Sequence, residues 1–366
     1  MISSDSYTTL LDATPPCFEN GKAAIVRNLP AGHGFGTTEV TTLRPSPGLE
    51  QRFLGYLIRT DRFRQSGIAS MTGAGGLKRV SDEYVRGFLI ALPPVSEQRQ
   101  IVRFLDCETA KVGALITKQE QLIATLREDR TATITHAVTR GLDPDVEMRD
   151  SGVPWIGQVP DHWEVVNIRR AALMKTGHTP SRSVAAYWEN TTIPWFTLAD
   201  VWQLRDGTRT YLGETSSCIS ELGLANSAAE LLPAGTVVFS RTASVGFSGI
   251  MPIPMATSQD FWSWICGPQL LPEYLMYLFR AMKDHFASLM MGSTHKTIYQ
   301  ADAAAIRIPL PPLAEQKEIV TEISSKAGAF DNLTDKAGEV IATLREYRSA
   351  LITDAVTGKI DVRGAA

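Results

Sequence analysis

Several polar segments of this chain carry side chains that could bind a nucleic acid. An arginine fork matches the O6 and N7 acceptors of guanine, whereas lysine, serine and threonine commonly hold phosphates. We therefore take Arg182 and Arg241 as candidates for base contacts and Lys296 as a candidate for a phosphate contact. The other candidates in the same three loops are hydroxyl side chains, at Thr179, Ser181, Ser240, Thr242, Ser293 and Thr294.

Each of these loops has a plainer interpretation as a solvated turn, which is the commoner role for such a segment. Three of them between residues 161 and 309 favour ligand contact. Before residue 93, Arg27, His33, Lys78 and Arg79 occupy comparable places. Aromatic side chains could stack on an unpaired base, although a core role is the commoner one, at Tyr187, Trp188, Trp195, Phe196 and Trp202.

No catalytic motif accompanies these loops. The glycine-rich segment 73–76 lacks the Lys-Ser/Thr ending of a phosphate-binding loop, and no Asn/Asp-Pro-Pro-aromatic tetrad is present. The acidic residues Asp200 and Asp206 lack the lysine context of a metal nuclease, and we assign both to loops. We therefore expect a protein that binds a partner without carrying out chemistry, with no catalytic residue, metal or cofactor of its own.

The composition sets further limits. With 366 residues and 44% hydrophobic content, the chain can form two or three domains with buried cores. The net charge of −3 and the pI of about 6.1 mean that nucleic-acid contact must come from local patches or from a partner. We expect a cytoplasmic protein without membrane contact, since there is no signal peptide and no apolar run approaching a membrane span. The cysteines are too widely spaced to suggest disulfides or zinc, at Cys17, Cys107, Cys218 and Cys266.

The chain contains an internal repeat. Pro93-Pro94-Val95-Ser96-Glu97-Gln98 returns as Pro311-Pro312-Leu313-Ala314-Glu315-Gln316, an offset of 311 − 93 = 218, and the register holds without gaps to Ala137-Val138-Thr139 and Ala355-Val356-Thr357. One inserted residue would rotate every later side chain of a helix by about 100°. An ungapped repeat of this length therefore predicts a long helix in each half.

Both predicted helices show a heptad pattern, which is typical of a coiled coil. Leu115 and Leu122 would widen the apolar stripe. Periodicity alone leaves parallel and antiparallel pairing open, and Arg130 and Arg348 in the seam could be register devices or solvated side chains. The predicted packing residues are Val102, Leu105, Val112, Ile116, Ile123 and Leu126 in the first helix, and Val320, Ile323, Phe330, Ile341, Leu344 and Leu351 in the second.

The rest of the chain mixes short strands and helices, so we expect an α+β fold. Residues 88–92 and 306–310 are predicted strands before the two helices, and residues 272–290 are a predicted helix. A second similarity links Leu54–Arg59 with Leu275–Arg280. The expected segments are 1–92, a partial globular domain; 93–140, the first long helix; 141–160, a linker; 161–309, a complete domain; 310–357, the second long helix; and 358–366, a tail.

These features together resemble the specificity subunits of type I restriction-modification systems. The resemblance covers essentially the whole chain and rests on the duplicated Leu-Pro-Pro-x-x-Glu-Gln segments and the crossing Gly152–Val165, Gly-Val-Pro-Trp-Ile-Gly-x-x-Pro-x-His-Trp-Glu-Val. The segments Gly177-His178-Thr179-Pro180-Ser181 and Gly34–Val40 add support. Full members open with a complete first recognition domain, whereas residues 1–92 look like only the later part of one.

The resemblance implies two target-recognition domains joined by two long antiparallel coiled-coil helices, which set the gap between two DNA half-sites. It also implies partners: double-stranded DNA, modification subunits that transfer a methyl group from S-adenosylmethionine to adenine N6, and restriction subunits that use ATP and Mg. The alternative is a decoy or truncated specificity subunit, which binds modification subunits through its helices without selecting a full DNA site.

Overall fold

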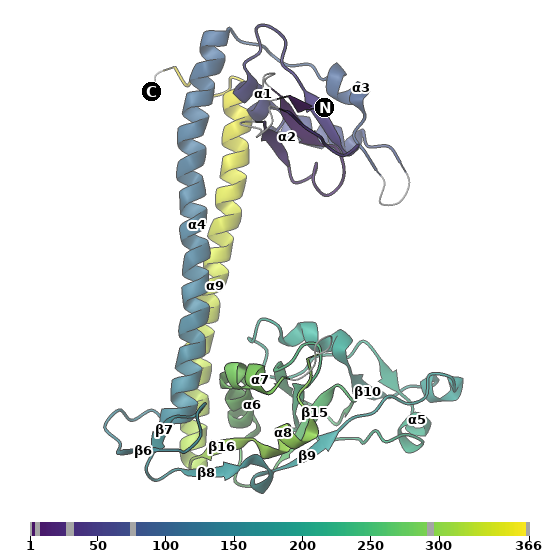
Figure 1. Cartoon of the computed structure of the whole chain (residues 1–366), viewed down its shortest axis with the longest axis vertical. Helices are drawn as coiled ribbons and strands as arrows, with labels where there is room; N and C mark the ends of the chain where they lie inside the picture. The colour runs from purple at the N-terminus through teal and green to yellow at the C-terminus, as the bar shows by residue number, and fades with distance from the viewer. Residues whose placement is uncertain (1, 4–7, 27–32, 74–77, 291–295, 364–366) are drawn as a thin grey trace. The chain divides into compact units, whose positions relative to one another are not determined.

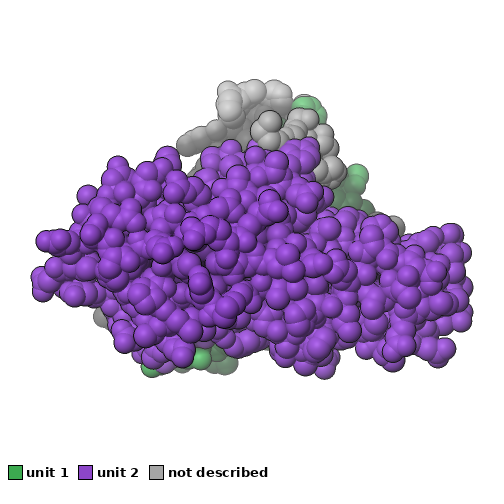
Figure 2. Space-filling view, turned by 90° about the horizontal axis from the view of Figure 1, so that it is seen from below, with its two compact units in different colours: residues 1–123, 336–366 green, residues 124–335 purple. Residues whose placement is uncertain are grey.

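The computed structural model describes all residues except 1, 4–7, 27–32, 74–77, 291–295 and 364–366 (Figure 1). The chain divides into two compact units (Figure 2). Unit 1 comprises residues 1–123 and 336–366, and unit 2 comprises residues 124–335. The boundaries fall inside the two long helices, so each unit contains part of both.

Unit 2 is built on an antiparallel sheet with the order β13-β12-β15-β9. The central strands, β12 (Val237–Ser240) and β15 (Phe261–Cys266), are almost wholly buried, as their apolar and aromatic residues favour. Helix α6 (Pro272–Ala281) packs on this sheet and buries Tyr274 to Phe279. The outer strands are β13 (Ser248–Ile250) and β9 (Ala172–Thr176).

A second sheet of unit 2 has the order β11-β10-β14, and the segment with Asp200 directly follows its central strand β10. We predicted that Asp200 lies in a loop, and this is wrong. Asp200 is buried in the 3-10 helix η4 (Leu198–Leu204). Its carboxylate accepts hydrogen bonds from the Thr197 backbone N–H at 2.9 Å and the Ser216 backbone N–H at 2.7 Å. The Thr-x-x-Asp spacing forms a capping box, which fixes this turn.

The predicted helix over residues 272–290 is instead two helices, α6 and α7 (Lys283–Leu289). Met282 separates them because its ψ of 13° leaves the helical range, while its side chain is buried in the core. The remaining elements of unit 2 are β6 (Met148–Asp150), β7 (Gln158–Pro160), β8 (Glu164–Asn167), η2 (Ile168–Arg170), η3 (Ala185–Trp188), β10 (Ile193–Phe196), β11 (Cys218–Ile219), α5 (Glu221–Ala225), β14 (Ala256–Thr257), α8 (Gln300–Ala305) and β16 (Arg307–Leu310).

Unit 1 contains a smaller antiparallel sheet with the order β3-β2-β5. Its core includes Leu11, Phe18, Phe53 and Phe63, all nearly inaccessible to solvent. Its elements are β1 (Ile2–Ser3), β2 (Thr9–Asp12), β3 (Ala23–Ile25), β4 (His33–Gly34), β5 (Val40–Leu43), α1 (Gln51–Leu57), α2 (Asp61–Ala69) and α3 (Asp82–Gly87).

The predicted strand over residues 88–92 is wrong. These residues follow α3 without pairing into a sheet, whereas β16, the equivalent segment of unit 2, pairs with β8. No described residue of unit 1 supplies a strand in the place of β8. A local sequence pattern cannot reveal this, because strand formation depends on a distant partner.

The two long helices are α4 (Val95–Arg140) and α9 (Leu313–Val356), close to their predicted bounds. In unit 1, Leu105 shares a core cluster with Ile352, while Val112 and Ile116 cluster with Ile341. The partner numbers fall as the α4 numbers rise, so the pairing is antiparallel. In unit 2, Arg130 pairs with Asp331 and Gly141 lies beside Glu315, which gives the same direction.

The seam between α4 and α9 is narrower than the sequence suggested. Leu115 and Leu122 are 48% and 45% exposed, because two paired helices cover only one narrow stripe of each. Among the predicted packing residues, Val102, Leu105, Val112, Ile116, Leu126, Ile323 and Ile341 are buried, and Ile123, Val320, Phe330, Leu344 and Leu351 are half-buried.

Two further contacts fix α4 and α9 within unit 2. Arg130 is not a solvated side chain: its Nε lies 3.0 Å from an Asp331 carboxylate oxygen, and Nη2 donates to the Gly207 carbonyl at 2.7 Å. Trp163, from the crossing segment, is buried and donates from Nε1 to Glu315 at 3.0 Å. The second contact gives this tryptophan a structural role.

Candidate nucleic-acid interface

The predicted contact loops of unit 2 are joined to one another by hydrogen bonds. The Thr179 hydroxyl donates to the Gln259 side-chain oxygen at 2.6 Å. The Arg241 backbone N–H donates to the Asp260 carbonyl, and the Arg241 carbonyl accepts from the Ile298 N–H, both at 2.9 Å. The segments 177–184, 241–246 and 296–298 therefore form one surface around the turn 257–260. We call this surface the loop surface of unit 2.

The sequence did not indicate that residues 257–260 belong to this surface. Their side chains carry no pattern that separates them from an ordinary turn. The segment that packs against residues 257–260 does carry a sequence signal for this close contact, the glycine at position 177. A Cβ atom built at Gly177 would lie 1.9 Å from the Thr257 carbonyl oxygen, so only glycine allows this close approach.

Arg182 lies on aromatic rings at the exposed side of the loop surface. Its guanidinium carbon is 3.8 Å from the ring centre of Trp188 and 5.4 Å from that of Trp195. The tryptophans are themselves fixed, because their indole N–H groups donate to the Ser181 and His178 carbonyls. Such a cation–π contact is worth about 0.5–1 kcal/mol at an exposed site. The Arg182 guanidinium has no hydrogen bond or ion pair with a described residue, so its N–H groups remain for a ligand.

Arg241 is more enclosed than Arg182. Its guanidinium carbon lies 4.3 Å from the ring centre of Trp262, and the residue is half-buried. Burial lowers the pKa of Arg241, while Asp260 and Tyr299 oppose that shift. Its Nε is buried and has no hydrogen-bond partner among the described residues. Only the two terminal nitrogens of Arg241 can therefore contact a ligand.

The hydroxyl candidates differ in what they can offer a ligand. Ser240 is fully buried and donates to the Ser244 carbonyl inside its own turn, which argues against a DNA contact there. The Thr242 hydroxyl pairs with that of Thr297 at 2.8 Å, beside the exposed Lys296. The Ser181 hydroxyl pairs with that of Ser183, also at 2.8 Å. These paired hydroxyls keep acceptor lone pairs for a ligand.

Some predicted residues fall elsewhere. Ser293, Thr294 and Arg27 lie outside the described residues. His33 lies in β4, and Lys78 is exposed. Arg79 forms an ion pair with Glu39, which occupies its guanidinium within unit 1.

The aromatic residues are only in part core residues. Trp195 and Phe196 are buried in unit 2, as the commoner interpretation holds. Trp202 is 62% exposed on η4, so a core role is wrong for this residue. Tyr187 and Trp188 are half-buried, and Trp188 supports Arg182.

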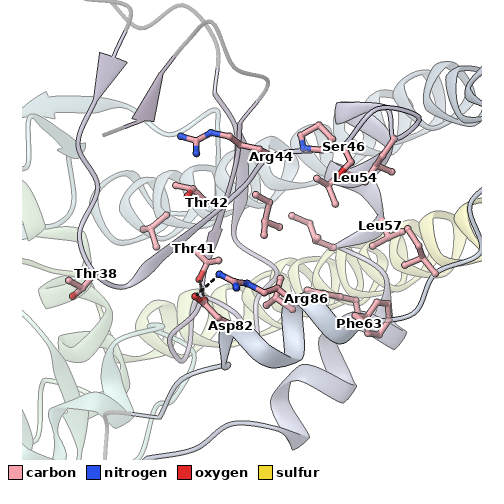
Figure 3. A pocket seen from close by; sticks show the side chains of 18 residues that line it. Thr38, Thr41, Thr42, Arg44, Ser46, Leu54, Leu57, Phe63, Asp82 and Arg86 are labelled. Carbon is pink, nitrogen blue, oxygen red and sulfur yellow. Dashed lines mark hydrogen bonds and ion pairs between the residues drawn. The ribbon is translucent and has the colours of Figure 1, made fainter.

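Unit 1 contains a cavity of about 680 Å³ beside the edge strand β5 (Figure 3). Its lining includes apolar side chains such as Leu57 and Phe63 together with polar ones. Thr41 and Arg86 both contact Asp82, at 3.5 and 3.9 Å (Figure 3). The sheet orders β3-β2-β5 and β13-β12-β15-β9 place β15 of unit 2 in the position of β5. On the side away from β12, β15 pairs with β9, whereas β5 has no partner on the side away from β2 among the described residues. The cavity therefore marks the unpaired side of β5.

The described residues contain no group of three or more His, Cys, Asp or Glu side chains that could hold a metal ion. Among these same residues, no helix is both long and apolar enough to span a bilayer. All four cysteines are free thiols. Burial raises the pKa of the Cys266 thiol to about 12, which makes it an unreactive core residue.

Comparison with known proteins shows which proteins the chain resembles. Residues 160–336 match the model of the type I restriction modification DNA specificity domain. The chain is 29% identical over 182 residues to the type I restriction enzyme MjaIX specificity subunit of Methanocaldococcus jannaschii. It is 24% identical over 352 residues to the putative MjaX specificity subunit of the same organism. The chain is therefore similar to type I restriction-modification specificity subunits, and residues 160–336 match their DNA specificity domain.

The extent of these matches differs. The match to the MjaIX subunit covers 49% of this chain and 40% of that protein, and the match to the MjaX subunit covers 94% and 76%. A solved structure concerned with complex assembly and conformational transition of the type I R-M system superposes with a TM-score of 0.75 at 21% identity. It covers 98% of this chain and 83% of that one, and shows that the two chains share a fold. The mixed fold with two long helices is thus confirmed.

Proposed function

We propose that this specificity subunit recognises DNA sequence for a type I restriction-modification complex and carries out no chemistry itself. The observation that carries the proposal is the loop surface of unit 2, which lies within the matched specificity domain. There, Arg182 is exposed and held over Trp188, so its fork is oriented before DNA arrives. A pre-positioned arginine suits guanine recognition in the major groove.

The similarity to type I restriction-modification specificity subunits supports a proposal for the partners. Modification subunits bound to the chain would transfer a methyl group from S-adenosylmethionine to adenine N6, and restriction subunits would use ATP and Mg to translocate and cut. The catalytic groups would then all belong to those subunits, in the cytoplasm where the DNA lies. The net charge of −3 supports this division, because the chain alone has no general attraction for DNA.

We further propose that the target is bipartite and that α4 and α9 set the spacing of its halves. The antiparallel pairing of the helices within each unit supports this idea. The direct test is to map adenine methylation across the genome of cells that express the chain with its modification subunits. A motif of two halves separated by a fixed gap is expected. Methylation without any sequence motif would contradict the proposal.

A second candidate has two specific observations in its favour. The sheet of unit 1 has no counterpart of β9 among the described residues, and Arg79 is already paired with Glu39. These features favour a subunit that binds modification subunits through its helices without selecting a full DNA site. The same methylation map separates the two candidates, because this one predicts a single half-site or no motif at all.

A further inference from the structure

A cavity of about 610 Å³ in unit 2 is rich in cationic side chains. It lies between α4, the segment after η4, the turn 245–248 and the α6–α7 region. We call it the arginine pocket of unit 2. Five lining residues are cations and one is an acid: Arg127, Arg130, Arg205, Arg280 and Lys283, with Asp206.

The positive charge of this pocket is only partly balanced. Arg130 pairs with Asp331, and Arg280 donates to the Arg209 carbonyl at 2.5 Å. The other three cations, Arg127, Arg205 and Lys283, form no side-chain hydrogen bond or ion pair with any described residue. Burial, and next the neighbouring Arg130, lower the pKa of Arg280 to about 10. Cations gathered at this density favour an anionic ligand.

The internal repeat builds the same pocket in unit 1. That cavity is about 660 Å³ and is lined by Arg345, Arg348, Ser349 and Ile352 of α9. The offset of 345 − 127 = 218 relates these four to Arg127, Arg130, Thr131 and Ile134 in the pocket of unit 2.

The equivalence extends beyond the long helices. Arg59 in the pocket of unit 1 corresponds to Arg280 through the second sequence similarity. Each pocket also includes a turn glycine with positive φ, Gly21 at 65° and Gly246 at 93°. The two pockets therefore share the arrangement of their lining residues as well as their positive charge.

The pocket of unit 1 also has an excess of positive charge. Arg59 donates to the Ala23 carbonyl and has no carboxylate partner among the described residues. Arg64 donates to the Glu19 carbonyl and lies 3.8 Å from an Asp61 carboxylate oxygen, and Arg345 pairs with Glu120 at 3.5 Å, but neither acid lines the pocket. Arg348, the seam arginine whose role the sequence left open, forms no ion pair with a described residue. The one acid in the lining, Asp106, is already paired with Arg52.

The shared plan indicates what the two pockets bind. Side chains that read bases follow the sequence of their own half-site, so they need not recur between two units that read different sequences. The pocket residues do recur, so their ligand is common to both half-sites. The DNA backbone is that common part, and arginine forks match its phosphate oxygens. In unit 2, the pocket turn 245–248 directly continues the loop surface that ends at Gly246.

We propose that each arginine pocket binds a phosphate group of the DNA backbone and so positions its unit on a half-site. This inference rests on the proposed function, which it deepens. A carboxylate of a partner subunit is the competing ligand, because arginine forks match it too.

The experiment uses the complex of the full chain with its modification subunits and two 30-base-pair duplexes, one with the mapped motif and one scrambled. The double variant Arg127→Gln and Arg205→Gln removes two cations that have no partner among the described residues. Arg348→Gln tests the pocket of unit 1. Arg169→Gln is the matched control, because Arg169 is exposed on η2 and lines neither pocket.

We expect the pocket variants to bind both duplexes more weakly and by the same factor. The slope of log K against log salt concentration should become shallower by about 0.9 for each phosphate that the variant no longer binds. The control should keep the parental slope. An unchanged slope overturns the inference, as does loss of modification subunits on size-exclusion chromatography. If no variant or parent prefers the motif duplex, the proposed function fails, although a changed slope would still support the pockets.

Discussion

Gln98 and Gln316 occupy equivalent positions at the starts of α4 and α9 and make the same three hydrogen bonds. Gln98 accepts from the Glu50 N–H and donates to the Gly48 and Pro93 carbonyls. Gln316 accepts from the Leu271 N–H and donates to the Gln269 and Pro311 carbonyls. Both side chains are fully buried. The duplicated Glu-Gln motif therefore fixes each long helix to the loop before α1 or α6.

Replacing Gln316 by leucine should destabilise unit 2 by about 2–4 kcal/mol, because a backbone N–H and two carbonyls lose their partner in a buried place. The urea midpoint followed by tryptophan fluorescence measures the change. Gln121→Leu, at an exposed position of α4, is the control and should shift the midpoint little. A Gln316→Leu midpoint equal to the parent would show that water replaces these hydrogen bonds.

Replacing Arg182 by alanine should reduce base discrimination by about 1–3 kcal/mol at one position of the target, because one guanidinium fork is lost. Competition between duplexes that differ in single base pairs measures this effect by fluorescence anisotropy. Arg182→Lys keeps the charge but not the fork, so it should restore affinity more than discrimination. Equal discrimination by the alanine variant would remove Arg182 from the readout.

Gly177→Ala and Gly113→Ala should have opposite effects on stability. At Gly177 the new Cβ meets the Thr257 carbonyl oxygen, and the overpacking should cost about 1–3 kcal/mol and displace the loop surface. Gly113 lies in α4, where an added Cβ would meet open space, so alanine should stabilise by about 0.5–1 kcal/mol. Thermal unfolding of the two variants tests both expectations. A neutral Gly177→Ala would show that the loop can retreat without strain.

The stability of unit 2 should fall as the solution becomes acidic, in part through His285. Burial lowers the pKa of this residue, which is half-buried and stacks on Trp155 with ring centres 6.1 Å apart. The unfolded chain therefore binds the proton first, and stability is lost as pH falls from about 6.5 through the lower folded pKa.

His285→Phe keeps an aromatic ring against Trp155 and cannot titrate, so it should lose less stability than the parent between pH 7.5 and pH 5. Urea midpoints across this range measure the difference. His136→Phe is the comparison, since this second histidine lies on α4 and has no side-chain hydrogen bond within the described structure. Parallel pH profiles for the parent and His285→Phe would exclude His285 as the source.

The long helices were accessible from the sequence because their information is local and repeated. The repeat and the heptad pattern located both ends of α4 and α9 to within three residues. It could not give their direction, which depends on pairs such as Arg130 and Asp331 that are far apart in the chain. The strand predicted over residues 88–92 failed for the same reason, since β16 forms a strand only because β8 lies beside it.

The candidate site was predictable by residue type more than by arrangement. Arginine, serine and threonine in turns suggested the loops, but the stacking of Arg182 on Trp188 and the burial of Ser240 follow from tertiary packing. The arginine pockets were missed, although Arg127, Arg130, Arg345 and Arg348 recur at the repeat offset. Only the fold shows that Arg59 lines the cavity of Arg345 and Arg348. In the same way, Arg280 lines the cavity of Arg127 and Arg130.

The division of the two long helices between units has a consequence for synthesis on the ribosome. Unit 2 is one continuous stretch, so its parts emerge in sequence and can assemble early. Unit 1 needs contacts such as the Asp61 backbone N–H with the Thr353 hydroxyl, which join residues 292 positions apart in the chain. Its core cannot be completed until the residues around Thr353 have been made, and its apolar surface stays open to chaperones or to aggregation until then.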